Sequence, residues 1–270
     1  MTTGRASQPL IVFGITGRMG QSLIAALREG SPFHLQAALA SPGSPRLGQE
    51  AAAEGLATGV KVTADGAEKL PPKSVALDFS VADAVAAHAR ACADAGVPLL
   101  VGATGFDPGA RKQLEAAAKS IAVLIAPNTG IGVAVMNQLV AQATRALGAG
   151  FDVEISEAHH RRKRDAPSGT ALSLGESVAG ARAIALEEAA VFDRHGADAA
   201  RSPGSIGFSV IRAGDIVGEH TVTFAGDGET LQITHRATDR ITFARGALRA
   251  AAWLIGRPAG LYDMKDVLGF

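Results

Sequence analysis

The sequence predicts an α/β protein with a Rossmann-type parallel sheet in one domain and an open, mostly antiparallel or mixed sheet in a smaller α+β domain. In the first half, short apolar runs alternate with helical stretches, as do the strands and covering helices of a parallel sheet. The first of these runs, residues 10–15, leads directly into a glycine turn. In the second half, runs of period two are separated by turn residues, as in hairpin-connected strands.

The first half contains further apolar runs of strand length at 35–40, 74–80, 97–106 and 121–130, and the alanine-rich stretches between them are predicted as helices. Three of these runs end in polar or glycine turns, and ligands of parallel sheets bind beyond the carboxyl ends of the strands. The alternative is that these turns only connect strands to helices and bind no ligand. The predicted nicotinamide contacts in these turns are Phe79, Gly102, Ala103, Thr104, Ala126, Pro127, Asn128 and Thr129.

The turn after the first strand is the predicted dinucleotide site. Its glycines follow the spacing G-x-x-G-x-x-G, which departs from the G-x-G-x-x-G of the standard motif. A tight turn, a close approach of backbone to a pyrophosphate and close helix packing each call for glycine at such places. A turn that only links a strand to a helix is the alternative. The predicted contacts are Gly14, Ile15, Thr16, Gly17, Arg18, Met19 and Gly20.

The end of the second strand bears on the choice of nicotinamide cofactor. An acidic residue at this place would hold the adenine ribose hydroxyls and repel the extra phosphate of NADPH. Here the strand ends at Ala40 and continues with Ser41, so that carboxylate is missing. Arg18, Ser41 and Arg46 remain as candidate partners of a 2′-phosphate, and we expect NADPH to be accepted at least as well as NADH.

The most informative segment is EAHHRRKRDAPSGT at residues 157–170. A period-two strand at 151–158 precedes it and an amphipathic helical stretch follows it, so its histidines are predicted in a strand-to-helix loop. Loops held by rigid elements often carry the chemistry of a protein. An active site competes here with two other interpretations, a solvated basic turn and a nucleic-acid contact.

Composition argues against the nucleic-acid interpretation. The chain has 26 basic and 26 acidic residues and a formal net charge of zero, whereas nucleic-acid-binding domains usually carry a basic excess. One Trp, one Tyr and ten Phe provide little material for stacking bases. A small anionic ligand therefore suits the loop better than a nucleic acid does.

The end of the segment predicts where that anion would bind. Ser168 is a good helix-capping residue and Gly169 lets a ligand approach the backbone, so a helix is predicted to begin at one of them. Its first amides and the Thr170 hydroxyl would then face a carboxylate or phosphate. A catalytic serine at position 168 is the alternative, but the G-x-S-x-G elbow of hydrolases is absent from APSGT.

Five segments resemble, in order and spacing, the dihydrodipicolinate reductase family of lysine biosynthesis, also called 4-hydroxy-tetrahydrodipicolinate reductases. They are GITGRMG, VGATGF, EAHHRRKRDAPSGTAL, IRAGDIVGEHTVTF and LYDMKDVL, and the resemblance covers essentially the whole chain. It implies a cytoplasmic enzyme that transfers hydride from NADH or NADPH to a cyclic imine dicarboxylate and yields tetrahydrodipicolinate. It also implies a homotetramer assembled through the open sheet.

By motif position, the resemblance gives His159 the role of general acid/base and Lys163 that of proton donor. This agrees with the chemistry, because the product of hydride addition must be protonated and a histidine can do that near neutral pH. A dinucleotide-binding sensor of the same fold without reductase activity is the alternative function. The residues that the resemblance places around the substrate carboxylates are His160, Lys163, Ser168, Gly169 and Thr170. Arg240 is a further candidate for this pocket.

The domain organisation follows from the two kinds of pattern. We expect a dinucleotide-binding domain at 1–130, completed by 239–270, and a substrate-binding and oligomerisation domain at 131–238. The second domain is predicted to hold about four strands, at 151–158, 206–212, 218–225 and 229–237. A final helix at 239–257 is predicted with Asp239 as its cap, and 183–203 as a long irregular connection.

Several features are expected to be absent. Cys92 is the single cysteine, so an intrachain disulfide is excluded, and its helical context predicts a buried thiol. His159 and His160 lack a third ligand at close spacing, so no metal site is predicted. No signal peptide is recognised before Leu10, and no apolar run approaches the roughly 20 residues of a membrane helix. We therefore expect a soluble, cytoplasmic protein.

Overall fold

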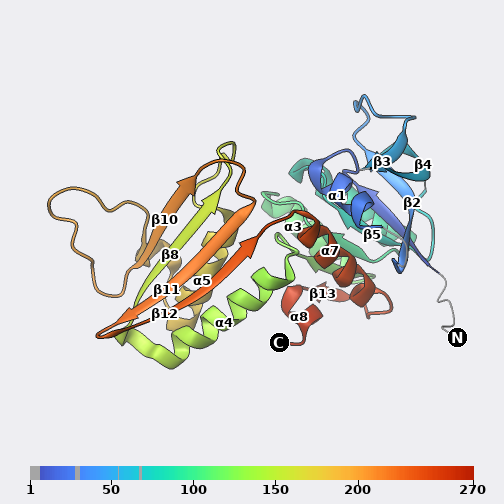
Figure 1. Cartoon of the computed structure of the whole chain (residues 1–270). Coiled ribbons are helices and arrows are strands. Elements are labelled where there is room, and N and C mark those ends of the chain that lie inside the picture. The colour runs from blue at the N-terminus through green and yellow to red at the C-terminus, as the bar shows by residue number, and fades with distance from the viewer. Residues whose placement is uncertain (1–6, 28–30, 54, 67–68) are drawn as a thin grey trace, which may run out of the picture. The chain divides into compact units, whose positions relative to one another are not determined.

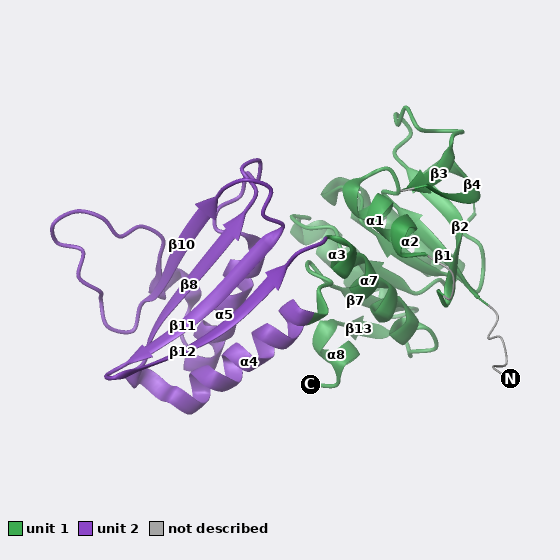
Figure 2. Ribbon diagram, in the orientation of Figure 1, with its two compact units in different colours: residues 1–131, 240–270 green, residues 132–239 purple. Residues whose placement is uncertain are grey.

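The computed structural model describes residues 7–27, 31–53, 55–66 and 69–270. The chain divides into two compact units, of which unit 1 comprises 1–131 and 240–270 and unit 2 comprises 132–239 (Figure 2). The roles predicted for the two parts, cofactor binding and substrate binding, stay predictions. The start of the chain, where the sequence predicts no signal peptide, lies mostly outside the described residues.

Within the described residues, unit 1 contains an eight-stranded sheet with the order β13-β7-β6-β5-β1-β2-β4-β3 (Figure 1). Its strands pair in parallel, except that β3 is antiparallel to β4. This confirms the predicted parallel sheet. The strands are β1 (Gln8–Phe13), β2 (Phe33–Ala40), β3 (Glu50–Ala53), β4 (Leu56–Ala64), β5 (Val75–Asp78), β6 (Leu99–Val101), β7 (Ala122–Ile125) and β13 (Gly260–Tyr262).

The helices of unit 1 bury apolar faces against this sheet. An apolar core joins α2 and α3 to β1, β5, β6 and β7, and includes Cys92, whose thiol is fully buried as predicted. Asp107 caps α3 by accepting the Ala110 amide at 2.7 Å, with Pro108 at the first helical position. The helices are α1 (Arg18–Ala26), η1 (Ala82–Ala84), α2 (Val85–Ala95), α3 (Pro108–Ala117), α7 (Ile241–Leu254) and α8 (Met264–Leu268).

Two predictions in unit 1 are wrong. The alanine-rich stretch after β2 forms strands β3 and β4 rather than a helix, because Val60 and Val62 continue a period-two pattern that pairs with β2. The last long helix begins at Ile241, and its N-cap residue is Arg240 instead of Asp239. The Arg240 carbonyl accepts the Phe243 amide at 3.0 Å, so the first turn closes one residue later than the sequence indicated.

Unit 2, all of whose residues are described, has a five-stranded mixed sheet with the order β12-β11-β8-β10-β9 (Figure 1). β8 is parallel to β10 and antiparallel to β11, which confirms a mixed sheet and the four predicted strands. Buried side chains of α4 and α5 form an apolar core with β8, β10 and β11. The elements are α4 (Ile131–Leu147), η2 (Gly148–Gly150), β8 (Asp152–His159), α5 (Gly169–Arg182), α6 (Leu186–Ala189), β9 (Ala190–Val191), β10 (Ile206–Arg212), β11 (Gly218–Gly226) and β12 (Glu229–Ala237).

The connection between α5 and β10 is only partly irregular. The prediction of an irregular stretch at 183–203 is wrong for its first part, because α6 and the two-residue strand β9 lie there. Leu186 of α6 is buried in the core of unit 2, and this contact orders the segment. Residues 192–205 have neither helix nor strand and form the long loop beside β10 (Figure 1). Nowhere in the described chain is a helix long and apolar enough to cross a membrane.

Candidate active site

The motif at 157–170 begins on β8 and ends in the first turn of α5. Alternation along β8 places Glu157 and His159 on one face of the strand. The register sets Arg212 of β10 opposite His159, and His220 of β11 opposite Glu157. Three strands therefore bring acidic, basic and imidazole side chains together. His159 is the last residue of β8 rather than part of the loop, so the prediction of a loop position is wrong for it.

Glu157 is a buried carboxylate, 2% exposed, that contacts three groups. Its Oε2 accepts from His159 Nδ1 at 2.6 Å, and its Oε1 accepts from the Ser168 amide at 3.0 Å. The Arg212 guanidinium donates to both oxygens, at 2.8 and 2.7 Å, which is the bidentate geometry of strong arginine–carboxylate pairs. Burial raises the Glu157 pKa, but the hydrogen bonds from Arg212 and His159 bring that pKa below its ordinary value.

His159 is held at one ring nitrogen and accessible at the other. Because a carboxylate only accepts, the bond to Glu157 makes Nδ1 the nitrogen that carries hydrogen and leaves Nε2 for proton transfer. A Cβ atom at position 218 would lie 3.1 Å from Nε2, so the glycine there leaves room for a ligand. Burial lowers the His159 pKa, Glu157 raises it, and the charges of Lys163 and Arg212 lower it, with a net decrease.

His220 lies against His159 with the rings edge to face and their centroids 5.2 Å apart. Its Nε2 is hydrogen-bonded to the Ser168 hydroxyl at 2.9 Å. Burial, followed by the charge of His159, lowers the His220 pKa to about 4, so this ring is neutral near pH 7. Ser168 is therefore fixed by His220 through its side chain and by Glu157 through its amide.

The start of α5 is built as the sequence predicted. Ser168 is the N-cap, and its Oγ accepts the Ala171 amide at 3.2 Å. Ser168 is 2% exposed, whereas Gly169 is exposed and Thr170 is half-buried. This confirms the helix start at Ser168 and Gly169, and a direct contact between Ser168 and a ligand stays a prediction.

Lys163 stands in the loop between the histidines and α5. Its Nζ donates to Asp165 Oδ2 at 2.8 Å, and its side chain is 22% exposed. Arg212 also donates to the Asp165 carbonyl, at 2.6 Å, so the arginine that holds Glu157 holds the loop as well. The Lys163 amide donates to the His160 carbonyl at 3.0 Å, and His160 is 9% exposed. Lys163 is therefore a partly exposed cation on a loop that hydrogen bonds hold in place.

In unit 1, the glycine turn fits a dinucleotide pyrophosphate. Gly14 has φ of 75°, and a Cβ there would lie 2.5 Å from the Phe79 carbonyl. A Cβ at Gly20 would collide with the Ile15 carbonyl. Helix α1 follows Gly17, which makes no side-chain cap, and its first turn contains no acidic residue. Uncapped amides at a helix N-terminus are suited to a phosphate.

The three other predicted nicotinamide turns lie at the ends of β5, β6 and β7, and the turn after β5 contacts the glycine turn. A Cβ at Gly102 would collide with the Phe79 ring, and the Gly102 amide donates to the Asp78 carbonyl at 2.8 Å. The turn after β7 contains Thr129, which is 2% exposed and donates from its hydroxyl to the Phe243 carbonyl at 2.7 Å. The structure therefore places Phe79 beside Gly14 and Gly102 beside the Phe79 ring, and gives the Thr129 hydroxyl a contact with α7.

Two arginines and a serine were predicted around a 2′-phosphate. Arg18 and Ser41 are exposed, and Arg46 is half-buried in the segment after β2. Among the described residues, the buried Nε of Arg46 has no hydrogen-bond partner. Arg240, the further candidate for the substrate pocket, is the N-cap residue of α7 in unit 1, and its contact with substrate stays a prediction.

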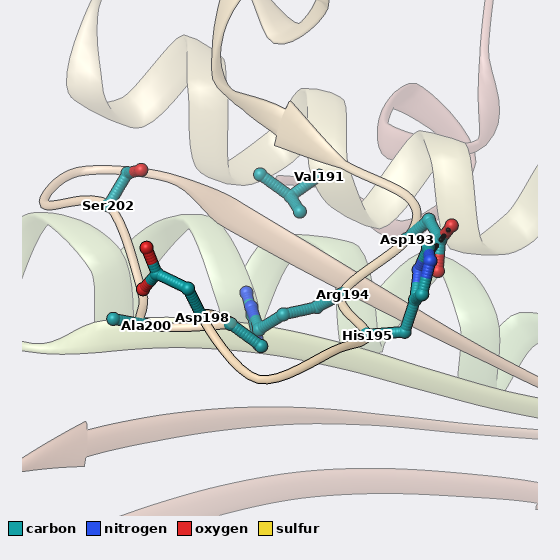
Figure 3. A pocket seen from close by; sticks show the side chains of 8 residues that line it. Val191, Asp193, Arg194, His195, Asp198, Ala200 and Ser202 are labelled. Atoms are coloured by element: carbon teal, nitrogen blue, oxygen red, sulfur yellow. Dashed lines mark ion pairs between the residues drawn. The ribbon is translucent and has the colours of Figure 1, made fainter.

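Two other features of the described chain bear on ligands. No group of three or more His, Cys, Asp or Glu side chains there could hold a metal ion. A cavity of about 270 Å³ lies in the 192–205 loop and includes Asp193, Arg194 and His195 (Figure 3). His195 pairs with Asp193 at 3.0 Å, and Arg194 pairs with Glu154 at 3.0 Å. This cavity contains no residue of the motif, so it is not the candidate site.

Comparison with known proteins identifies the family. The family model described as "Dihydrodipicolinate reductase, N-terminus" matches residues 8–129, and the one described as "Dihydrodipicolinate reductase, C-terminus" matches residues 132–268. The chain belongs to the dihydrodipicolinate reductase family. This confirms the predicted family and the predicted class of enzyme, an NAD(P)H-dependent oxidoreductase.

Individual relatives agree over nearly the whole chain. A 4-hydroxy-tetrahydrodipicolinate reductase of Thiobacillus denitrificans is 49% identical over 259 residues, covering 96% of this chain and 97% of the relative. One of Bordetella parapertussis is 47% identical over 268 residues, covering 99% of each. The structure of a dipicolinate-bound dihydrodipicolinate reductase from Paenisporosarcina sp. TG-14 matches with a TM-score of 0.72 at 22% identity, covering 95% of this chain and 97% of that one. It shows the same fold.

Four residues around His159 and Ser168 had no role predicted from the sequence, namely Glu157, Arg212, Gly218 and His220. Glu157 had a local signal, because it precedes His159 by two residues in a period-two strand and so shares its face. Arg212, Gly218 and His220 lie in the strands predicted at 206–212 and 218–225, but no role was predicted for them. Their contacts depend on which strands are neighbours, and no local pattern reports that.

Proposed function

We propose that this chain reduces 4-hydroxy-tetrahydrodipicolinate or dihydrodipicolinate to tetrahydrodipicolinate in lysine (diaminopimelate) biosynthesis, with His159 as general acid/base and Lys163 as proton donor. The observation that carries the proposal is the His159 ring, fixed by Glu157 at Nδ1 and open beside Gly218 at Nε2. A protein that only binds a dinucleotide needs no such oriented proton donor. The relatives named above support the substrate, since each is named for this reaction.

In the proposed reaction, His159 and Lys163 of the motif at 157–170 transfer the proton. The bound nicotinamide cofactor supplies the hydride, and the addition leaves negative charge on the ring-nitrogen side of the conjugated imine. His159 supplies the proton from Nε2, while Glu157 keeps the hydrogen on Nδ1 and stabilises the ring in either charge state. Lys163 lies on the loop that follows β8 and is a second source of protons and positive charge.

The substrate carboxylates require cations and amide donors. We assign them to the loop and the start of α5, where His160, Lys163, Gly169 and Thr170 lie within one short segment. Ser168 contributes by holding the helix start in place. The positive end of the α5 dipole adds to the attraction for a carboxylate.

For the cofactor, we propose that NADPH is used at least as well as NADH. The support is the absence of a carboxylate in the sequence directly after Ala40, together with Arg18, Ser41 and the unpartnered Nε of Arg46 among the described residues. Arg46→Ala is expected to raise the KM for NADPH and to leave the KM for NADH unchanged. A preference of the unaltered chain for NADH above about tenfold, or roughly 1.4 kcal/mol, would contradict the proposal.

We further propose a cytoplasmic homotetramer assembled through the open sheet of unit 2. Support for assembly comes from Ile211 of β10, an apolar side chain that is 55% exposed and points away from the face that α4 and α5 cover. Sedimentation of the purified chain tests the oligomeric state, and a monomer at micromolar concentration would contradict it.

The reaction is tested by the absorbance of reduced nicotinamide, with substrate prepared immediately before use by the preceding enzyme of the pathway. We expect substrate-dependent oxidation of NADPH, and competition with substrate by pyridine-2,6-dicarboxylate. Lys163→Ala should lower turnover and raise the substrate KM together, because one side chain serves both steps. Binding of NADPH without turnover would instead support the dinucleotide-binding sensor.

A further inference from the structure

Unit 1 contains a buried cluster of two aspartates and a histidine that the proposed reaction does not use. Asp78, at the end of β5, is 0% exposed, and His88 of α2 is 5% exposed. His88 Nδ1 lies 2.9 Å from Asp78 Oδ2, and His88 Nε2 lies 3.3 Å from Asp65 Oδ2. Both ring nitrogens are therefore taken by carboxylates. We refer to Asp65, His88 and Asp78 as the Asp–His–Asp cluster.

The cluster fixes the turn that follows β5. The other carboxylate oxygen of Asp78 accepts the amide of Ser80 at 2.9 Å and its hydroxyl at 2.5 Å. The Asp78 carbonyl accepts the amides of Gly102 and Ala103, at 2.8 and 3.1 Å. Through one residue the cluster is thus bonded to two turns predicted to contact the nicotinamide, those after β5 and β6.

Phe79 lies between these turns and the glycine turn. The Phe79 amide donates to the Phe13 carbonyl at 3.1 Å. The Phe79 carbonyl lies so close to Gly14 that a Cβ at position 14 would be only 2.5 Å from it. The Phe13 ring in turn stacks on His88, with centroids 3.9 Å apart and an angle of 18° between the planes. His88 therefore supports the Phe79 turn from the buried side, through Asp78 and through Phe13.

The other end of the cluster reaches the end of β2. Asp65 directly follows β4, and its amide donates to the Ala40 carbonyl at 2.8 Å. Ala40 precedes Ser41, a candidate contact of the 2′-phosphate. His88 thus connects the segment predicted for the nicotinamide with the segment predicted for the adenine ribose.

We propose that the Asp–His–Asp cluster positions the cofactor-binding turns of this chain, so that His88 sets the affinity for a nicotinamide dinucleotide without touching it. The inference rests on the proposed cofactor. Apolar residues would fill the same space at no desolvation cost, whereas a buried charge is tolerated only with complete partners. Besides His88, the Asp78 carboxylate is bonded to the amide and hydroxyl of Ser80 in the turn after β5. The carboxylate therefore holds that turn in position as well as stabilising the fold.

Two substitutions separate the halves of the cluster. In His88→Asn, the side-chain amide nitrogen takes the position of Nδ1 and keeps the contact with Asp78. In His88→Gln, the side-chain amide nitrogen takes the position of Nε2 and keeps the contact with Asp65. The Kd for NADPH is measured by nicotinamide fluorescence without substrate. We expect His88→Gln to raise this Kd by about tenfold, the effect of losing a hydrogen bond to a charged group. His88→Asn should raise it less, because the fully buried Asp78 keeps its partner.

Cys92→Ala is the matched control, since it removes a buried group four residues further along α2 and leaves the bonds of Asp78 in place. Its Kd for NADPH should equal that of the unaltered chain even if its thermal unfolding midpoint falls. An unchanged Kd in both His88 variants, or an equal rise in Cys92→Ala, would overturn the inference. An unaltered chain that binds NADPH but reduces no imine would contradict the proposed function alone, since the variants would still report on the cluster.

Discussion

Two histidines of this protein are each held by a buried carboxylate, and they differ in what remains open on the imidazole ring. His88 in unit 1 has Asp78 at Nδ1 and Asp65 at Nε2, and it is 5% exposed. His159 in unit 2 has Glu157 at Nδ1 and the space beside Gly218 at Nε2, and its side chain is 12% exposed. The first ring has no nitrogen left for a ligand, whereas the second does.

The two rings show that a carboxylate partner can hold a histidine in place without making it reactive. A carboxylate next to a histidine is often interpreted as catalytic, yet both rings here have one. The second nitrogen decides the role, since proton transfer needs a nitrogen within hydrogen-bond reach of the substrate.

The largest effect is expected from His159→Asn. The asparagine amide keeps the contact with Glu157 and removes Nε2, so only the reacting nitrogen is lost. Turnover should fall by about 10²- to 10⁴-fold, the usual range for a general acid, while the Kd for NADPH stays constant. The measurement is steady-state kinetics with nicotinamide fluorescence as the binding control. Near-normal turnover would mean that the open nitrogen is not the proton donor.

Glu157→Gln tests the carboxylate that holds His159. Glu157 raises the His159 pKa, so removing its charge lowers that pKa further. A general acid works when protonated, and activity should therefore be lost at lower pH in the variant, with turnover reduced by about tenfold. The pH profile of kcat is the measurement. A pH profile of Glu157→Gln identical to that of the unaltered chain would contradict the assignment.

Gly218→Ala tests the space beside Nε2. The added methyl would lie 3.1 Å from that nitrogen, closer than ordinary contact, so the substrate or the ring must shift by a fraction of an ångström. We expect turnover to fall by about tenfold or less, because positional errors of 1 Å cost more. Gly226→Ala is unsuitable as a control, since a Cβ there would press on Phe151. Gly180→Ala, in open space on α5, should leave turnover unchanged.

The smallest effect concerns stability and a third histidine. The folded-state pKa of His220 is lowered to about 4 from an ordinary 6.5, so the unfolded chain binds a proton that the folded chain excludes. Stability is therefore complete above pH 6.5 and falls as the pH drops toward 4. Between pH 6.5 and pH 5 the loss due to His220 should be about 2 kcal/mol. Urea unfolding should show less acid destabilisation in His220→Gln, whereas His34→Gln, at an exposed position of β2, should behave as the unaltered chain does.

Much of the fold was predictable because the relevant signals are local. The strands at 206–212 and 229–237 have the predicted bounds, since period-two alternation and turn residues lie within the segments themselves. The start of α5 was predictable for the same reason, because Ser168 caps through the Ala171 amide three residues away. Where the local signal was composition alone, as in the alanines at 51–53, the prediction of a helix was wrong.

The sequence by itself determined the family, the parallel and mixed sheets, and the motif that contains His159, Lys163 and the start of α5. Only the tertiary structure decided which groups surround His159 and which surround His88. Arg212 meets Glu157 across 55 residues of chain, and His88 meets Asp65 across 23. The physical reason is that hydrogen-bond partners in a sheet protein are set by strand order and register, which arise from the packing of the whole unit and leave no periodic trace in either segment.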